Sequence, residues 1–241
     1  MKLATGIIPA RYDSKRFPGK HLAVILGKSI IQRVYEQAQT ANLLQRIIIA
    51  TDDERIFQAC QAFGAEVLMT SPLHNSGTER AAEIAEKINT PIIINIQGDE
   101  PLLRGKMIDD LVIALQDETI PMATIAAKVK DLSLINEKNI VKAVLDKNGF
   151  ALYFSRSPLP FQASDYFWQH IGIYGYQRDF LLEFSQLSAS RLETTEKLEQ
   201  LRVLENGYKI KIIETSSPTL SVNTPQDIIR IENFLKQRTN D

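Results

Sequence analysis

The chain has 241 residues, of which 44% are hydrophobic and 24% charged, a usage typical of a globular protein that can bury a sizeable core. A formal net charge of -1 provides no global field for capturing nucleic acid or an anionic membrane. No apolar run approaches the roughly 20 residues of a membrane helix, and no signal-cleavage pattern follows Met1, so we expect a soluble, cytoplasmic protein. The one cysteine, Cys60, excludes an internal disulfide.

From residue 1 to about 128, short β-branched runs alternate with segments of helical period. This alternation predicts successive β-α units on a mostly parallel sheet flanked by helices. The predicted strands are 4–9, 46–50, 66–69, 91–96 and 122–127. The predicted helices have three apolar stripes: Ile30, Ile31, Val34 and Ala38; Ile56, Ala59, Cys60 and Phe63; and Ala81, Ala82, Ala85 and Ile88.

The pattern changes after residue 128. Two apolar runs, 141–146 and 150–154, flank Asn148-Gly149, a strong hairpin-turn signal, which predicts an antiparallel insertion. One late helix is predicted over 195–205 with Gly207 at its stop, and another opens at Thr224-Pro225. We therefore expect an α/β fold with a nucleotide-binding core, 1–128 plus 207–241, and a smaller antiparallel subdomain, 129–206.

The first predicted strand leads into a turn that is rich in positive charge. Residues 9–20 carry four cations, Arg11, Lys15, Arg16 and Lys20. In an open α/β fold, ligands bind beyond the carboxyl ends of the strands, so these cations lie where a polyphosphate would bind. The alternative is a solvated basic loop. We favour the anion cradle because Gly19 and two prolines shape the backbone.

The fourth predicted strand ends in a tight turn at Gly98-Asp99. A carboxylate there can hold Mg²⁺, which takes one or two carboxylates together with water and substrate phosphates. Asp99 is therefore the leading metal-ligand candidate, with an ordinary turn aspartate as the alternative. Leu22 stands where a P-loop needs glycine, and no Gly-x-Gly-x-x-Gly follows a strand, which disfavours a P-loop protein and a dehydrogenase.

Two further motifs could each have a structural role, a functional role, or both. Ser76 to Glu79 matches a helix capping box, and the same helix N-terminus, with Ser76 and Arg80, could also bind the nucleotide. Thr51-Asp52-Asp53 could cap a helix or bind a ribose hydroxyl or metal, and we favour the cap.

In the second half of the chain, Arg156, His170 and Tyr174 lie on or beside the insertion sheet. An Arg fork suits a sugar carboxylate, and His and Tyr can bind hydroxyls, although a lone His or Tyr is more often plain packing. Glu199 and Gln200 lie off the apolar stripe of their helix and face solvent or sugar. The three histidines have no metal-ligand or triad spacing, which disfavours structural zinc and nucleophilic hydrolysis.

Taken in order, these motifs resemble the CMP-Kdo synthetase family, the 3-deoxy-manno-octulosonate cytidylyltransferases. The resemblance covers nearly the whole chain, and the first motif is shared with other sugar nucleotidyltransferases. It rests on Ile8 to Arg11 with Phe17 to Lys20, Ala50-Thr51-Asp52, Ser76 to Arg80, Asn95 to Pro101, Ala151 to Arg156, His170 to Tyr174, and Leu198 to Arg202.

The resemblance implies a nucleotidyltransferase fold, a homodimer formed through the 129–206 subdomain, Mg²⁺ as the only cofactor, and transfer of CMP from CTP to Kdo for lipopolysaccharide assembly. Arg11, Lys20 and Asp99 are the implied catalytic residues. The implied CTP contacts are Ala10, Arg11, Ser14, Arg16, Lys20, Ser76, Gly77 and Arg80. The implied sugar contacts are Gln97, Arg156, His170, Tyr174, Glu199 and Gln200.

The chain departs from the family pattern at one implied metal ligand, where Asn223 replaces the usual aspartate. A neutral amide oxygen attracts a dication less strongly than a carboxylate. Two alternatives to Kdo cytidylyl transfer stand. One is the same chemistry on an amino-substituted Kdo or another keto-sugar acid, because sequence does not resolve the exchange of a hydroxyl for an amine. The other, for which Asn223 is the only argument, is a nucleotide-binding homologue with weakened catalysis.

Overall fold

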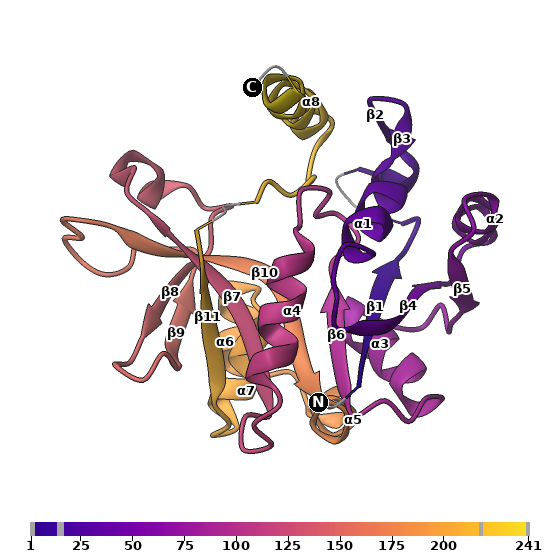
Figure 1. Ribbon diagram of the computed structural model, residues 1–241. Helices are drawn as coiled ribbons and strands as arrows, with labels where there is room; N and C mark the ends of the chain where they lie inside the picture. Colours follow the sequence, from indigo (N-terminus) through magenta and orange to yellow (C-terminus); the bar gives the residue numbers. More distant parts are fainter. Residues whose placement is uncertain (1–2, 14–16, 217–218, 240–241) are drawn as a thin grey trace. The chain divides into compact units, whose positions relative to one another are not determined.

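The computed structural model describes residues 3–13, 17–216 and 219–239 (Figure 1). They pack as two compact units. The N-terminal unit comprises Leu3–Thr90, Asn95–Asp109 and Thr219–Asp241, and the central unit comprises chiefly Pro91–Ile94 and Asp110–Pro218. Packing does not test which segment binds which ligand, so the functional division into 1–128 with 207–241 and 129–206 stays a prediction.

The N-terminal unit is built on parallel strands. Its strand order is β1-β4-β5, and both β1 with β4 and β4 with β5 are parallel (Figure 1). Every residue of β1 is buried, as expected for a parallel strand covered on both faces. The strands, which confirm the predicted positions, are β1 (Ala4–Ala10), β4 (Leu44–Thr51) and β5 (Glu66–Met69). The fourth predicted strand is confirmed as β6 (Ile92–Ile96), which begins in the central unit and ends in this one.

Three amphipathic helices cover these strands. Helices α1 (Ile30–Ala38) and α3 (Gly77–Glu86) pack on β1, and α2 (Glu54–Ala62) packs on β4 and β5. The predicted α1 and α3 stripes are buried, whereas α2 buries only Ile56 and Cys60 of its stripe. The remaining elements that begin in this unit are η1 (Lys20–Leu22), β2 (Val24–Ile25), β3 (Lys28–Ser29), α4 (Gly105–Ala114) and α8 (Pro225–Thr239).

The central unit is mostly antiparallel. Strand β7 (Met122–Val129) pairs antiparallel with β10 (Phe167–Gln177) and parallel with β11 (Ile210–Thr215). The predicted hairpin is present as β8 (Lys142–Leu145) and β9 (Ala151–Ser155), with Gly149 in the left-handed conformation at φ +76°. The predicted fold class, a mostly parallel α/β sheet with a smaller antiparallel part, is confirmed.

The helix predicted over 195–205 is wrong as a single element. The chain forms α6 (Arg191–Glu196) and α7 (Gln200–Glu205), separated by Lys197 in the left-handed conformation at φ +56°. A full capping box between Ser190 and Glu193 starts α6 earlier than the apolar pattern indicated. The unit also contains η2 (Leu132–Asn136) and α5 (Arg178–Gln186). None of the helices in the described chain is long and apolar enough to cross a membrane.

Candidate functional site

A polar pocket lies in the N-terminal unit, where β1 and β6 end and α3 begins. It has a cavity volume of about 200 Å³. The turns that follow β1 and β6 meet there, since a Cβ added to Gly98 would lie 2.9 Å from the Pro9 carbonyl oxygen. The residues predicted from sequence that line it are Ala10, Arg11, Lys20, Ser76, Gly77, Arg80, Gln97 and Asp99. Two further candidates, Ser14 and Arg16, lie outside the described residues.

The cation cradle and the acidic turn meet directly in this pocket. The Lys20 ammonium donates to Oδ2 of Asp99, and the two side chains are 15% and 21% exposed. Gly19 precedes Lys20 in the left-handed conformation at φ +68°, and its N–H donates to the Tyr12 carbonyl oxygen over 2.8 Å. The turn that glycine permits therefore closes the loop and directs Lys20 at Asp99.

The start of α3 also borders the pocket. Ser76 is the N-cap of the helix, and its hydroxyl oxygen accepts from the Glu79 N–H over 3.1 Å. In a full capping box the Glu79 side chain would accept from the main-chain N–H of Ser76. Here it accepts from the N–H of Asn75 instead. A helix N-terminus of this kind can still bind an anion through its main-chain N–H groups. Helix α2 is capped by Asp53, which confirms the cap reading there.

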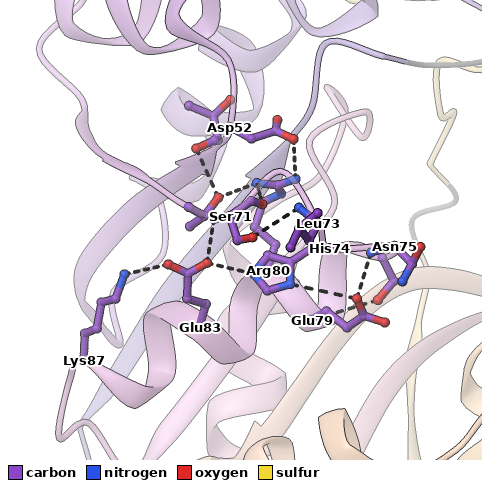
Figure 2. A network of polar contacts seen from close by, with 12 residues as sticks. Asp52, Ser71, Leu73, His74, Asn75, Glu79, Arg80, Glu83 and Lys87 are labelled. Atoms are coloured by element: carbon purple, nitrogen blue, oxygen red, sulfur yellow. Dashed lines mark hydrogen bonds and ion pairs between the residues drawn. The ribbon is translucent and has the colours of Figure 1, made fainter.

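Arg80 is buried and occupied by protein partners (Figure 2). Its guanidinium donates to Asp52 Oδ2 over 2.9 Å, to the Thr70 hydroxyl, and to the Ser71 carbonyl oxygen over 3.3 Å. The side chain is 3% exposed. Arg80 thus joins α3 to the ends of β4 and β5, and its contact with a nucleotide stays a prediction.

His74 is a pocket residue that sequence reasoning did not select. Figure 2 shows its ring between two carboxylates of α3: Nε2 lies 2.7 Å from Glu83 Oε2, and Nδ1 lies 3.9 Å from Glu79 Oε2. Burial alone would raise the pKa of Glu83, but hydrogen bonds from Lys87, the Ser71 N–H and His74 lower it to about 2. Glu83 is therefore an anion that holds the His74 imidazole in place.

Asn223 lies next to the acidic turn through the main chain. The Val222 N–H donates to the Asp99 carbonyl oxygen over 2.9 Å. The Asn223 side-chain nitrogen donates to the Ser221 hydroxyl over 3.0 Å. A cation would bind the amide oxygen of Asn223, because the amide nitrogen only donates. In the described part of the chain, no group of three or more His, Cys, Asp or Glu side chains forms a ready metal site. A metal here would depend on substrate oxygens for its remaining ligands.

In the central unit, Arg156 is anchored among backbone carbonyls. Its Nε donates to the Glu196 carbonyl oxygen over 3.1 Å, and Nη1 donates to the Lys138 carbonyl oxygen over 3.0 Å. The buried Lys142 ammonium donates to the Arg156 carbonyl oxygen over 2.7 Å, and burial lowers the pKa of Lys142. These contacts hold the guanidinium at the end of β9.

His170 has one tautomer that satisfies its neighbours. The Thr124 hydroxyl donates to the Ile173 carbonyl oxygen over 2.7 Å, so it accepts from His170 Nε2, 3.0 Å away. Burial lowers the pKa of His170 to about 3, so the ring is neutral near pH 7. Nδ1 is then a hydrogen-bond acceptor, which suits a hydroxyl of a ligand.

Tyr174 and Gln200 lie in the same part of the central unit. The Tyr174 ring centroid lies 5.5 Å from that of His170, and the Tyr174 hydroxyl donates to Gln200 Oε1 over 3.4 Å. Gln200 is 3% exposed, and its Nε2 has no hydrogen-bond partner among the residues that the structure describes. A buried donor without a partner is costly, so this amide is suited to a bound ligand. Glu199, beside it, is half-buried.

The structure thus brings the predicted residues together in two sets. Gln97 lines the pocket of the N-terminal unit with the nucleotide candidates, and the other five sugar candidates lie in the central unit. Sequence reasoning missed His21, His74 and Lys142. His21 directly follows Lys20 in the cation cradle, which is the one signal that could have selected it.

Comparisons with known proteins agree with this geometry. A family model described as Cytidylyltransferase matches residues 5–212. The 3-deoxy-manno-octulosonate cytidylyltransferase of Syntrophotalea carbinolica is 48% identical over 96% of this chain and 98% of its own length. The solved CMP:2-keto-3-deoxy-manno-octonic acid synthetase complexed with CTP is 39% identical, with a TM-score of 0.93 over 98% of this chain and 100% of that one. The 4-diphosphocytidyl-2C-methyl-D-erythritol synthase of Anaerococcus prevotii is 13% identical, with a TM-score of 0.66 over 98% of this chain and 96% of that one, and shares the fold alone.

Proposed function

Since the chain belongs to the cytidylyltransferase family, among relatives named 3-deoxy-manno-octulosonate cytidylyltransferase, we propose that it transfers CMP from CTP to Kdo. The products are CMP-Kdo and pyrophosphate, and the activated sugar serves lipopolysaccharide biosynthesis. The observation that carries the proposal is the pocket in which the Lys20–Asp99 pair, Arg11 and the N-terminus of α3 meet. A cytoplasmic homodimer is part of the same proposal.

In the proposed reaction, the anomeric oxygen of Kdo attacks the α-phosphorus of CTP in line. The new bond joins that oxygen to the α-phosphorus, the bond from the α-phosphorus to the β-phosphate oxygen breaks, and the hydroxyl proton passes to solvent. Arg11 and Lys20 would bind the triphosphate and stabilise the charge of the leaving pyrophosphate. The first turn of α3 would add N–H donors from Ser76 and Gly77.

The residues around Asp99 fit a magnesium ion. Asp99 offers a carboxylate that already attracts a cation, the Lys20 ammonium, and Asn223 offers an amide oxygen on the segment bound to the Asp99 main chain. Hard oxygen donors of this kind, completed by substrate phosphates, are typical of Mg²⁺ sites. When bound, the ion would lower the pKa of the sugar hydroxyl and offset phosphate charge.

Lys20 would then have two partners. Lys20 donates to Asp99 in the structure, and with CTP bound its ammonium could turn to the phosphates, which would release the carboxylate. The exchange keeps both charges paired in either state, which limits the desolvation cost in a partly buried site.

On the sugar side, the central unit would supply recognition. Arg156 would bind the carboxylate of Kdo, since its guanidinium is held by carbonyls that do not neutralise its charge. His170 would accept from a sugar hydroxyl through Nδ1, and Gln200 would donate through its unpartnered Nε2. Tyr174 and Glu199 would complete the hydroxyl contacts of the central unit, and Gln97 is the sugar candidate in the pocket of the N-terminal unit.

The test is pyrophosphate release from CTP with Kdo and Mg²⁺, with the sugar omitted as a control. We expect release only when all three are present. CTP should be strongly preferred over GTP, because a pocket shaped for one ring cannot admit a purine without repacking. Release with an amino-substituted Kdo but not with Kdo would redirect the sugar assignment. CTP binding without turnover on any keto-sugar acid would identify a nucleotide-binding homologue and overturn the proposal.

A further inference from the structure

His21 is a buried pocket residue with no role in the reaction as proposed above. It lies in η1, directly after Lys20, and is 5% exposed. Its Nδ1 is 3.0 Å from the carbonyl oxygen of Gly98, which directly precedes Asp99. Adjacent residues of η1 therefore contact adjacent residues of the acidic turn: Lys20 binds the Asp99 side chain, and His21 binds the Gly98 main chain.

The contact determines which nitrogen of the His21 ring carries the proton. A carbonyl oxygen only accepts, so the proton must be on Nδ1 of His21. Burial, followed by the charge of Lys20, lowers the pKa of His21 to about 4, so the ring is neutral near pH 7 and has a single N–H. That one donor is used for the Gly98 carbonyl.

The packing leaves the turn little room to move. A Cβ added to Gly98 would lie 2.9 Å from His21 Cε1 and 2.9 Å from the Pro9 carbonyl oxygen. The glycine is thus enclosed between the imidazole edge and the end of β1. The imidazole thus contributes a hydrogen bond and a steric contact to the turn. The turn can approach β1 this closely because residue 98 has no side chain.

From these contacts we propose that His21 is a positioning residue, which donates from Nδ1 to the Gly98 carbonyl and thereby aims Asp99 at Lys20 and at the metal-nucleotide complex. The inference rests on the proposed function, because it is the cytidylyltransferase reaction that needs Asp99 in this orientation. His21 touches no reacting atom and acts through the turn.

A matched pair of amide substitutions tests this role. In His21→Asn the side-chain NH₂ can occupy the place of Nδ1, whereas in His21→Gln it is displaced by one methylene toward the place of Nε2. His21→Leu fills the volume without a donor. Each variant, after a thermal unfolding check, is assayed for pyrophosphate release from CTP and Kdo over a Mg²⁺ titration, with separate measurement of the KM for Kdo.

We expect His21→Asn to retain turnover within about threefold, and His21→Gln and His21→Leu to lose roughly tenfold, the worth of one buried hydrogen bond that orients a catalytic group. The Mg²⁺ concentration for half-maximal rate should rise in the latter two, with the KM for Kdo unchanged. A merely structural histidine would lower stability in all three without moving the Mg²⁺ dependence.

Two results would overturn the inference: a folded His21→Leu with wild-type Mg²⁺ dependence, or an asparagine variant as impaired as the glutamine variant. If neither Gln nor Leu folds, His21→Ala replaces them as the variant without a donor, and a folded His21→Ala with wild-type Mg²⁺ dependence would likewise overturn the inference. Failure of the proposed function is distinguishable, since the wild-type protein would then release no pyrophosphate. In that case the same variants are compared by their effect on CTP affinity with Mg²⁺ present, where Asn should again match wild type.

Discussion

The main-chain N–H of Val222 donates to the main-chain carbonyl oxygen of Asp99 over 2.9 Å, which joins the segment before α8 to the turn after β6. The next residue, Asn223, is held by Asp227, whose Oδ2 accepts from the Asn223 N–H over 2.9 Å and from the Thr224 N–H over 2.8 Å. Two segments that are distant in sequence are therefore fixed side by side. The proposed assistance of Asp99 by Asn223 rests on this arrangement.

Asn223→Asp should strengthen Mg²⁺ binding, because a carboxylate adds the Coulomb attraction that the amide lacks. We expect a lower Mg²⁺ concentration for half-maximal rate and a higher turnover. The measurement is a Mg²⁺ titration of both proteins at saturating CTP and Kdo. Equal Mg²⁺ demand and equal turnover would show that position 223 is not a ligand and belongs to the turn that leads into α8.

Lys20→Ala should lower turnover by at least about tenfold in a folded protein, since losing a charge-assisted contact to the leaving group costs on the order of 1.5–3 kcal/mol. Lys28→Ala is the matched control, because Lys28 is an exposed lysine whose 2.7 Å ion pair with Glu36 lies on the surface. Pyrophosphate release by both variants decides the matter. Comparable rates for the two would remove Lys20 from the catalytic residues.

Arg80→Ala should destabilise the N-terminal unit by about 3–5 kcal/mol, because it leaves Asp52 without its buried partner. Arg46→Ala removes an exposed pair with Glu66 and should cost only about 0.2–1 kcal/mol. Urea unfolding compares the two. A small loss of stability in Arg80→Ala together with a large loss of CTP affinity would instead make Arg80 mainly a nucleotide ligand.

His170 should make the protein less stable in acid. Its folded-state pKa, lowered by burial to about 3, lies below the usual 6.5, so the unfolded chain binds the proton more readily. The stabilisation from neutral His170 is complete above pH 6.5 and is lost as the pH falls toward 3, at most roughly 3 kcal/mol between pH 6.5 and 4. Urea unfolding of wild type and His170→Gln should show a difference in stability that shrinks from pH 7.5 to pH 4.5. A difference independent of pH would contradict it.

Much of the fold follows from local pattern. The five predicted strands, the α1 and α3 stripes and the hairpin at Asn148-Gly149 are all present, because apolar period and turn conformation are properties of short segments. The helix predicted over 195–205 shows the limit of that argument. Nothing in its helical period signals the left-handed Lys197, whose N–H donates to the Glu193 carbonyl oxygen and ends α6.

The sequence by itself also selected Lys20, Asp99 and Ser76 as site candidates, since charge and turn residues after strands indicate where ligands bind in an α/β fold. Only the tertiary structure decided how these residues are used. In the described part of the chain, Arg80 donates to Asp52 and Thr70, and the buried Gln200 Nε2 has no partner. His21 contacts the Gly98 carbonyl oxygen. Such assignments depend on contacts between segments tens of residues apart, and a hydrogen-bond partner that distant leaves no trace in the local period or composition of either segment.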